Sequence, residues 1–242
     1  MTIVGARVGF LRGDYGHDLA ENPRFPTWPC TFDPMEAYRP LIEARRAGRE
    51  AVRLFLCEGG EGVRLGADGA VTGVSERLLH AIEVIQEGAA LHGLYLYWSL
   101  LDAGSVEEGD AVTGSILAGG DAAARFAERV AAPIAKALDP QRTLALDAVS
   151  GATGESAEAV ALIGDAVRAE APIVITAGAS AAHLRAVWRG GKLDGVDVRG
   201  PLATRAELAA ALDDPRVAEE RVPLFAGDAE APDALGYAAV FV

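Results

Sequence analysis

Short apolar runs that alternate with longer segments constrain the fold of this chain more than any other feature. The runs are bounded by glycines and polar residues, the pattern typical of buried strands that open into loops. We expect eight strands, at residues 7–11, 51–56, 94–101, 143–149, 172–176, 193–198, 222–226 and 237–242. The chain is therefore organised as a series of repeated strand units.

Helical segments fill most of the gaps between these strands. Asp33 before Pro34, and Ser75 before an apolar stretch, are signals for a helix start, and Gly93 is a signal for a helix end. The expected helices are residues 34–48, 75–90, 121–138, 156–170, 180–188 and 204–212. Strands joined by helical crossovers indicate a parallel sheet, and eight such strands close a (β/α)₈ barrel.

A doubly wound open sheet is the competing architecture. It carries a glycine-rich phosphate-binding turn after its first strand, and residues 9–13, Gly-Phe-Leu-Arg-Gly, lack that pattern. We therefore predict an α/β protein with one compact TIM-barrel domain over residues 1–242, a usual length for such a barrel.

Charge and composition narrow the classes of partner. The net charge of −13 disfavours binding to nucleic-acid phosphates or anionic membranes, and no apolar run approaches the roughly 20 residues of a membrane span. The N-terminus lacks a signal-peptide pattern, so we expect a cytoplasmic protein. Cys30 and Cys57 fit free thiols, with a disulfide as the alternative. No zinc-type spacing is present, and we expect no cofactor.

Arg53 lies inside the apolar run 51–56, where a buried charge is costly unless it meets carboxylates. Glu58 and Glu61 follow the same run and are the nearest candidates along the chain. We expect the closest acidic neighbours of Arg53 to include Glu58 or Asp228, with their pKa values lowered by the positive charge. The alternative is a structural ion pair without chemistry.

Function in a (β/α)₈ barrel is located at the C-terminal ends of the strands. This rule selects a set of polar and aromatic candidates: Arg12, Asp14, Arg53, Glu58, Trp98, Asp102, Arg199 and Asp228. Asp147 lies within the fourth expected strand, before its end, and we expect it to form a buried ion pair rather than to take part in the site.

Several strand endings together resemble a known family. They are Arg53 on the second strand, the aromatic third strand near Asp102, LDAVSG on the fourth, VDVRG on the sixth and VPLFAGD on the seventh. In element order they resemble the cellulase- and mannanase-like retaining glycoside hydrolases over essentially the whole chain. The resemblance implies a (β/α)₈ barrel with a sugar site at its mouth.

The chain departs from this family at the positions that carry its chemistry. The fourth strand of the family ends in Asn-Glu-Pro, whose Glu is the general acid/base, and the matching residues 150–152 read Ser-Gly-Ala. The nucleophilic Glu of the seventh strand corresponds to Asp228, and the expected His of the sixth strand is Arg199. Retaining hydrolysis needs two carboxyl groups about 5 Å apart. We therefore expect standard hydrolysis to be impaired or lost, as in a pseudoenzyme.

The strand-end rule and the resemblance together suggest provisional roles. Any remaining catalysis falls to Asp228 and Glu58, and the substrate-binding set is Arg12, Asp14, Arg53, Trp98, Asp102 and Arg199. Trp98 either stacks on a sugar or fills the outer layer of the barrel. Asp102 either faces the site or caps the next turn.

Two other functions stay open. One is a non-catalytic protein that binds a carbohydrate or another small molecule. The other is an enzyme of a different class, metal-assisted or acid-catalysed, in which Asp228 acts with Glu58 or Asp102. These carboxylates and Asp147 could bind Mg²⁺ or Ca²⁺ through oxygen ligands, although no spacing requires it.

The end of the sequence suggests a partner copy. The family barrel adds a covering helix after its eighth strand, whereas this chain ends at Val242, in or just past that strand. The outward apolar residues of the strand would then face water, and apolar patches of that size are unusual on a monomer. We expect a homodimer that covers this region, with residues 1–6 folding across it as the alternative.

Overall fold

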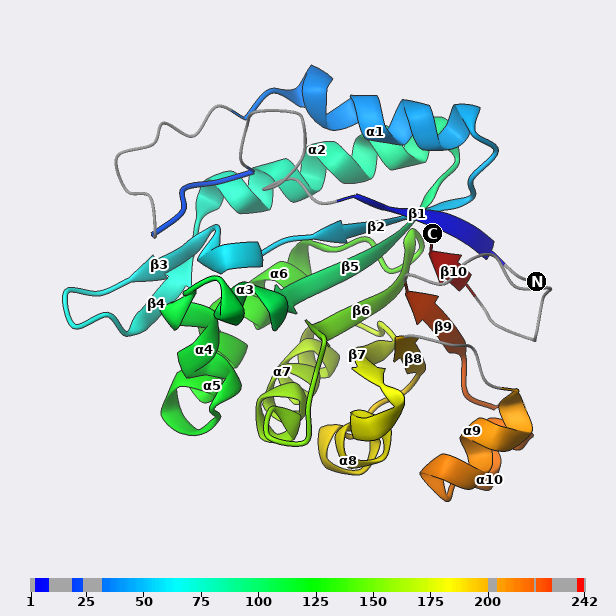
Figure 1. The fold of residues 1–242 in the computed structure, drawn as a ribbon. Coiled ribbons are helices and arrows are strands. Elements are labelled where there is room, and N and C mark those ends of the chain that lie inside the picture. Colours follow the sequence, from blue (N-terminus) through cyan, green and yellow to red (C-terminus); the bar gives the residue numbers. More distant parts are fainter. Residues whose placement is uncertain are drawn as a thin grey trace.

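A computed structural model describes residues 3–8, 19–23, 32–199, 204–219, 221–227 and 239–241 (Figure 1). For residues 3–8 and 239–241 it describes the backbone alone. The predicted roles of Arg12, Asp14 and Asp228 fall outside these residues, as does Cys30. Cys57 is a buried free thiol.

The strands form a closed barrel in the order β1-β10-β9-β8-β7-β6-β5-β2, and all neighbouring pairs are parallel. The barrel strands are β1 (Ile3–Val8), β2 (Ala51–Phe55), β5 (Tyr95–Asp102), β6 (Thr143–Ser150), β7 (Ile175–Ser180), β8 (Val196–Arg199), β9 (Leu224–Gly227) and β10 (Ala239–Phe241). The predicted fold class, an α/β barrel of eight parallel strands, is confirmed.

Helices lie around the outside of the barrel (Figure 1). They are α1 (Pro34–Arg46), α2 (Glu76–His92), α3 (Gly104–Glu107), α4 (Ala111–Leu117), α5 (Gly120–Phe126), α6 (Ala132–Ala137), α7 (Ala157–Glu170), α8 (Ala181–Gly191), α9 (Arg205–Leu212) and α10 (Pro215–Ala218). The predicted boundary signals act as expected. The Asp33 and Ser75 side chains cap α1 and α2, and Gly93 ends α2 in the left-handed conformation.

The sequence patterns missed several short elements. A two-stranded antiparallel hairpin, β3 (Val63–Leu65) with β4 (Val71–Val74), follows a 3₁₀ turn, η1 (Glu58–Gly60). The expected helix 121–138 is interrupted by a π-helical turn, η2 (Ala127–Ala131), just before Pro133. Proline lacks the N–H needed for a regular helical hydrogen bond, which accounts for a change of helix type at this place.

The fifth barrel strand was placed too early. The expected strand 172–176 begins with Pro-Ile-Val-Ile, but β7 covers Ile175–Ser180 and includes Ala-Gly-Ala. These small residues are buried, and the backbone N–H of Gly178 is used inside the barrel. Apolar run length alone therefore misplaced a strand whose barrel end is built from small side chains.

Both the inner and the outer face of the barrel sheet are buried. Outward side chains pack with the helices in the main core, which includes Leu54, Trp98 and Leu146. Inward positions combine a small apolar cluster, with Tyr97 and Phe225, and fully buried polar residues. The homodimer stays a prediction because the side chains of β1 and β10 lie outside the description.

Candidate functional site

Arg53 is the centre of a buried polar cluster inside the barrel. Its side chain is 1% exposed, and it forms ion pairs with Asp147 and with Asp197, the latter at 3.3 Å. Its Nε donates a hydrogen bond to Ser99 Oγ at 3.0 Å. The acidic partners therefore come from β6 and β8, rather than from Glu58, which is a neighbour along the chain.

Further hydrogen bonds hold the cluster together. Asp147 accepts from the backbone N–H of Gly178 at 2.9 Å and from Ser99 Oγ at 2.9 Å. The Tyr97 hydroxyl donates to Asp197 Oδ2 at 2.6 Å and lies 2.7 Å from Thr176 Oγ1. Asp147 thus forms the buried ion pair expected from its position within the strand.

Burial and charge act in opposite directions on Asp197. Loss of solvent raises the pKa of its carboxyl, and the nearby Arg53 and the Tyr97 hydrogen bond oppose this without cancelling it. The prediction that acidic neighbours of Arg53 have lowered pKa values is therefore wrong for Asp197. The reason is burial, which outweighs the attraction of Arg53, and the negative charge of Asp147 raises the pKa of Asp197 further.

This shift predicts a pH-dependent stability that Asp197→Asn should remove. The folded protein keeps the Asp197 proton above the ordinary carboxyl pKa of 3.8, so its stabilisation is complete below that pH and is lost as pH rises through the folded pKa. Relative to Asp197→Asn, the wild type should lose up to about 1.4 kcal/mol of unfolding free energy per pH unit in that window. Urea unfolding across roughly pH 4 to 8 measures this difference. A constant difference would contradict the raised pKa.

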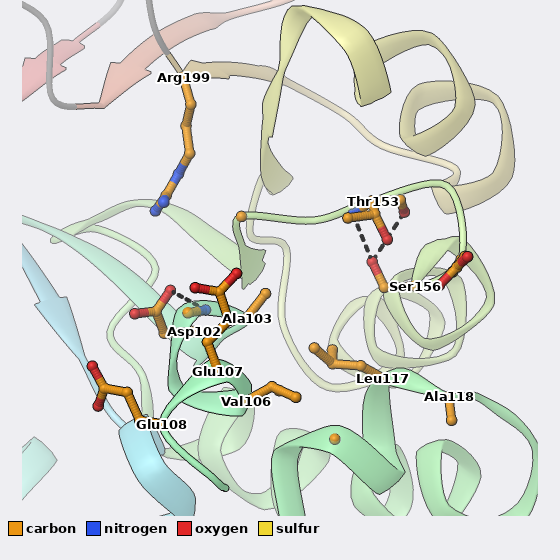
Figure 2. A pocket seen from close by; sticks show the side chains of 14 residues that line it. Asp102, Ala103, Val106, Glu107, Glu108, Leu117, Ala118, Thr153, Ser156 and Arg199 are labelled. Carbon is orange, nitrogen blue, oxygen red and sulfur yellow. Dashed lines mark hydrogen bonds between the residues drawn. The ribbon is translucent and has the colours of Figure 1, made fainter.

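A pocket of about 790 Å³ opens at the C-terminal ends of the barrel strands (Figure 2). Asp102 at the end of β5, Gly151 after β6 and Arg199 at the end of β8 contribute to its wall. The loops and short helices that follow β5 and β6 add three exposed carboxylates: Glu107, Glu108 and Glu155. Among the described residues, the pocket wall is therefore rich in carboxylates and contains one guanidinium.

Asp102 occupies this wall through the pairing of β5 with β6. It lies opposite Ser150 in the register, and the chain turns directly after it, where Ala103 N–H bonds to Ser150 O at 2.8 Å. Its Oδ1 accepts a hydrogen bond from Gly104 N–H at 3.3 Å. Asp102 is 9% exposed, lies in the pocket wall and supports the following turn, and its role in binding stays a prediction.

Gly151 leaves an open position beside Arg199. Its φ of 79° is in the left-handed region that glycine favours. A Cβ at this residue would lie 3.5 Å from Ala103 Cβ and 3.7 Å from Arg199 Nη1. A side chain introduced at residue 151 would therefore start between these two groups, at the pocket wall.

The structure separates the predicted site residues into groups. Asp102 and Arg199 share the pocket, whereas Arg53 is buried among its own partners and is not part of the pocket wall. Glu58 is 6% exposed in η1 and is not part of this pocket wall, so its catalytic role stays a prediction.

Trp98 needs a correction. It was included among the substrate-binding candidates, but its side chain is 0% exposed and belongs to the core between the strands and the helices. A residue in this position cannot stack on a sugar in the pocket. Its outward direction follows from the sheet register, because Trp98 lies beside Leu54 and Leu146, which are also in that core.

Sequence reasoning missed two kinds of residue. Asp197 could have been found by the rule that selected Arg53, since it is a charged residue within an expected apolar strand. Glu107, Glu108 and Glu155 carry no such signal, because they lie in loops or short helices whose positions depend on the packing around the barrel mouth.

Comparison with solved structures identifies the fold. The chain superposes on β-1,4-mannanase from the sea hare Aplysia kurodai with a TM-score of 0.68 and 11% identity, covering 99% of this chain and 87% of that one. Its superposition on endo-1,4-β-mannanase from Eisenia fetida has a TM-score of 0.70 and 9% identity, covering 99% of this chain and 83% of that one. For β-mannanase from the blue mussel Mytilus edulis the TM-score is 0.66 and the identity 14%, and the superposition covers 99% of this chain and 86% of that one. No protein-family model and no curated protein sequence matches the chain.

The architecture is thus a (β/α)₈ barrel. More narrowly, the chain has the fold of the cellulase- and mannanase-like glycoside hydrolases, as the sequence resemblance implied. Within the described part of the chain, no helix is long and apolar enough to cross a membrane. The same residues contain no group of three or more His, Cys, Asp or Glu side chains placed to hold a metal ion.

Proposed function

We propose that this protein is a divergent glycoside hydrolase-like barrel whose pocket binds a sugar or polyol and whose standard retaining hydrolysis is impaired or lost. The observation that carries this proposal is the open position at Gly151, at the wall of a polar pocket at the strand ends. The family resemblance places the general acid/base at this residue. Glycine has no side chain that can donate or accept the proton.

The neighbouring arginine fits the same interpretation. A general acid must be protonated when the reaction begins, and a positive charge close to a carboxyl group favours its ionised form. Arg199 Nη1 would lie 3.7 Å from the Cβ of any side chain at residue 151. Arg199 would lower the pKa of a carboxyl group at residue 151. Arg199 at the end of β8 and Gly151 after β6 are therefore both unfavourable for acid catalysis.

The nucleophile position adds a second obstacle. The resemblance assigns it to Asp228, which follows the Gly227 that pairs with Arg199 in the sheet. Aspartate is one methylene shorter than glutamate, and its oxygens would be about 1.5 Å further from the sugar. Displacements of this size reduce rates by orders of magnitude.

Hydrolysis and binding can be tested together. We expect aryl β-mannosides and β-glucosides to be cleaved at or near the uncatalysed rate, while calorimetry detects binding of the corresponding sugars or polyols. Turnover that vanishes in Asp228→Ala would instead establish residual hydrolysis. Turnover that a chelator abolishes would favour a metal-assisted enzyme. The absence of both binding and turnover would contradict the proposal.

Restoring the carboxyl pair should restore some hydrolysis. The double variant Gly151→Glu with Asp228→Glu supplies the two groups that the retaining mechanism needs, and we expect measurable aryl glycoside cleavage. The left-handed backbone at residue 151 should reduce stability by about 1–3 kcal/mol. Gly48→Glu with Asp228→Glu is the matched control, because Gly48 has a φ of 75° and open space around its Cβ position. Equal activity of the two double variants would contradict the assignment of residue 151.

A further inference from the structure

Arg199 brings to the pocket a guanidinium with unused hydrogen-bonding capacity. The side chain extends from the end of β8 into the pocket (Figure 2). Its Nε and Nη2 atoms are buried, and neither has a hydrogen-bond partner in the described part of the chain. Leaving a buried donor unsatisfied is unfavourable, most of all for a charged group. A ligand that accepts from this guanidinium would remove that cost.

The carboxylate nearest to Arg199 along its own strand is already engaged. Asp197 lies two residues earlier, where its Oδ2 is 3.3 Å from Arg53 Nη2 and accepts a hydrogen bond from the Tyr97 hydroxyl at 2.6 Å. No ion pair joins Arg199 to a carboxylate among the described residues, whereas Arg53 has two. The positive charge of Arg199 is therefore the less compensated of the two.

The space beside Arg199 is bounded by small residues. Gly151 has no side chain, and the Cβ of Ala103 lies 3.5 Å from where a Cβ of residue 151 would be. Arg199 Nη1 is 3.7 Å from the same point. An acidic group could occupy this space next to the guanidinium, but no described residue of the wall supplies one at this position.

We propose that the pocket recognises a sugar acid, a hydroxylated monocarboxylate of the uronic or aldonic type, whose carboxylate pairs with Arg199 beside Gly151. This inference rests on the proposed sugar- or polyol-binding function and specifies its ligand. Arginine and carboxylate form short, charge-assisted hydrogen bonds that can be bidentate. The ligand would thus supply the negative charge that a general acid would otherwise have placed beside residue 151.

The remaining carboxylates of the pocket favour hydroxyl groups on the rest of the ligand. Asp102 and the exposed Glu107, Glu108 and Glu155 can accept hydrogen bonds from hydroxyl groups. The exposed glutamates are screened by solvent and salt, so they do not cancel the attraction of Arg199 at short range. They do oppose additional negative charge, which favours one carboxylate per ligand over a polyanion.

Calorimetry with matched ligands tests this proposal. D-glucuronate and D-gluconate carry the carboxylate, whereas D-glucose and the methyl ester of D-glucuronate keep the hydroxyls without the charge. We expect the acids to bind at least about tenfold more tightly than the neutral ligands, and Arg199→Gln to weaken acid binding by at least about tenfold. Arg199→Lys should fall between, because lysine keeps the charge without the planar fork.

Controls separate the possible outcomes. Arg185→Gln removes an exposed arginine of α8 and should leave binding of every ligand unchanged. Equal affinity for acids and neutral sugars, unaffected by Arg199→Gln, would overturn the sugar-acid proposal and leave the sugar-binding function intact. Acetate binding as tightly as D-glucuronate would show a general anion site and also overturn it. Binding of no ligand to the folded protein would overturn both the proposal and the function on which it rests.

Discussion

Asp147→Ala is expected to lower the free energy of unfolding by about 3–5 kcal/mol, the usual effect of removing one partner of a buried ion pair. Asp147 and Arg53 are 0% and 1% exposed, and Asp147 also accepts hydrogen bonds from Ser99 and Gly178. The substitution leaves the Arg53 charge with Asp197 alone and removes the acceptor of a buried backbone N–H. Chemical denaturation of the purified variant measures the change.

A surface ion pair provides the control for this measurement. Asp165 on α7 is half exposed and pairs with Lys192 at 2.8 Å and Arg168 at 3.2 Å. Asp165→Ala should cost no more than about 1 kcal/mol, because solvent screens exposed pairs. If Asp147→Ala does not fold, Asp147→Asn retains the shape of the side chain and permits the same comparison. A loss from either Asp147 variant no larger than that from Asp165→Ala would contradict the structural role of the cluster.

Trp98→Ala should cost a similar amount, about 3–5 kcal/mol, because it removes a large side chain from the core outside the barrel. Trp98 is 0% exposed, whereas Tyr95, also on β5, is half-buried. Tyr95→Ala, an aromatic truncation on the same strand, should therefore be less destabilising. Equal losses of unfolding free energy from the two truncations would contradict the buried position of Trp98.

Ligand binding tests the same conclusion independently of stability. Trp98→Phe retains an aromatic ring and should fold, and its affinity for any ligand of the pocket should equal that of the wild type. A stacking platform would behave differently, since removal of an indole from a sugar site reduces affinity directly. A clear loss of affinity in folded Trp98→Phe would show that Trp98 takes part in ligand binding.

Substitutions in the pocket and in the buried cluster should affect different properties of the protein. The Arg53 cluster is held by hydrogen bonds and ion pairs within the barrel, although Arg53 Nη1 and Asp197 Oδ1 have no hydrogen-bond partner among the described residues. Arg199, which contributes to the pocket wall, has two buried nitrogens without a hydrogen-bond partner and no ion pair to a carboxylate in the described part of the chain. Substitution of Arg53 should therefore act mainly on stability, whereas substitution of Arg199 should act mainly on binding.

Much of the fold could be predicted from local patterns. Apolar strand runs and helix boundary signals such as Asp33, Ser75 and Gly93 specified the order of the elements and the barrel. These signals are local because a helix cap or a strand run depends on residues close together in the chain. Even the need of Arg53 for carboxylate partners followed from its buried strand, because an unpaired buried charge is too costly.

The identity of those partners was decided by the tertiary structure alone. Barrel strands are buried on both faces, so their sequences lack the alternation that would show which residues point inward. Register places Arg53 beside Tyr97 and Ser99 beside Asp147 inside the barrel, and turns Trp98 outward. Arg199 and Gly151 meet for the same reason, since residues 48 positions apart become neighbours only when β6, β7 and β8 pair in one closed sheet.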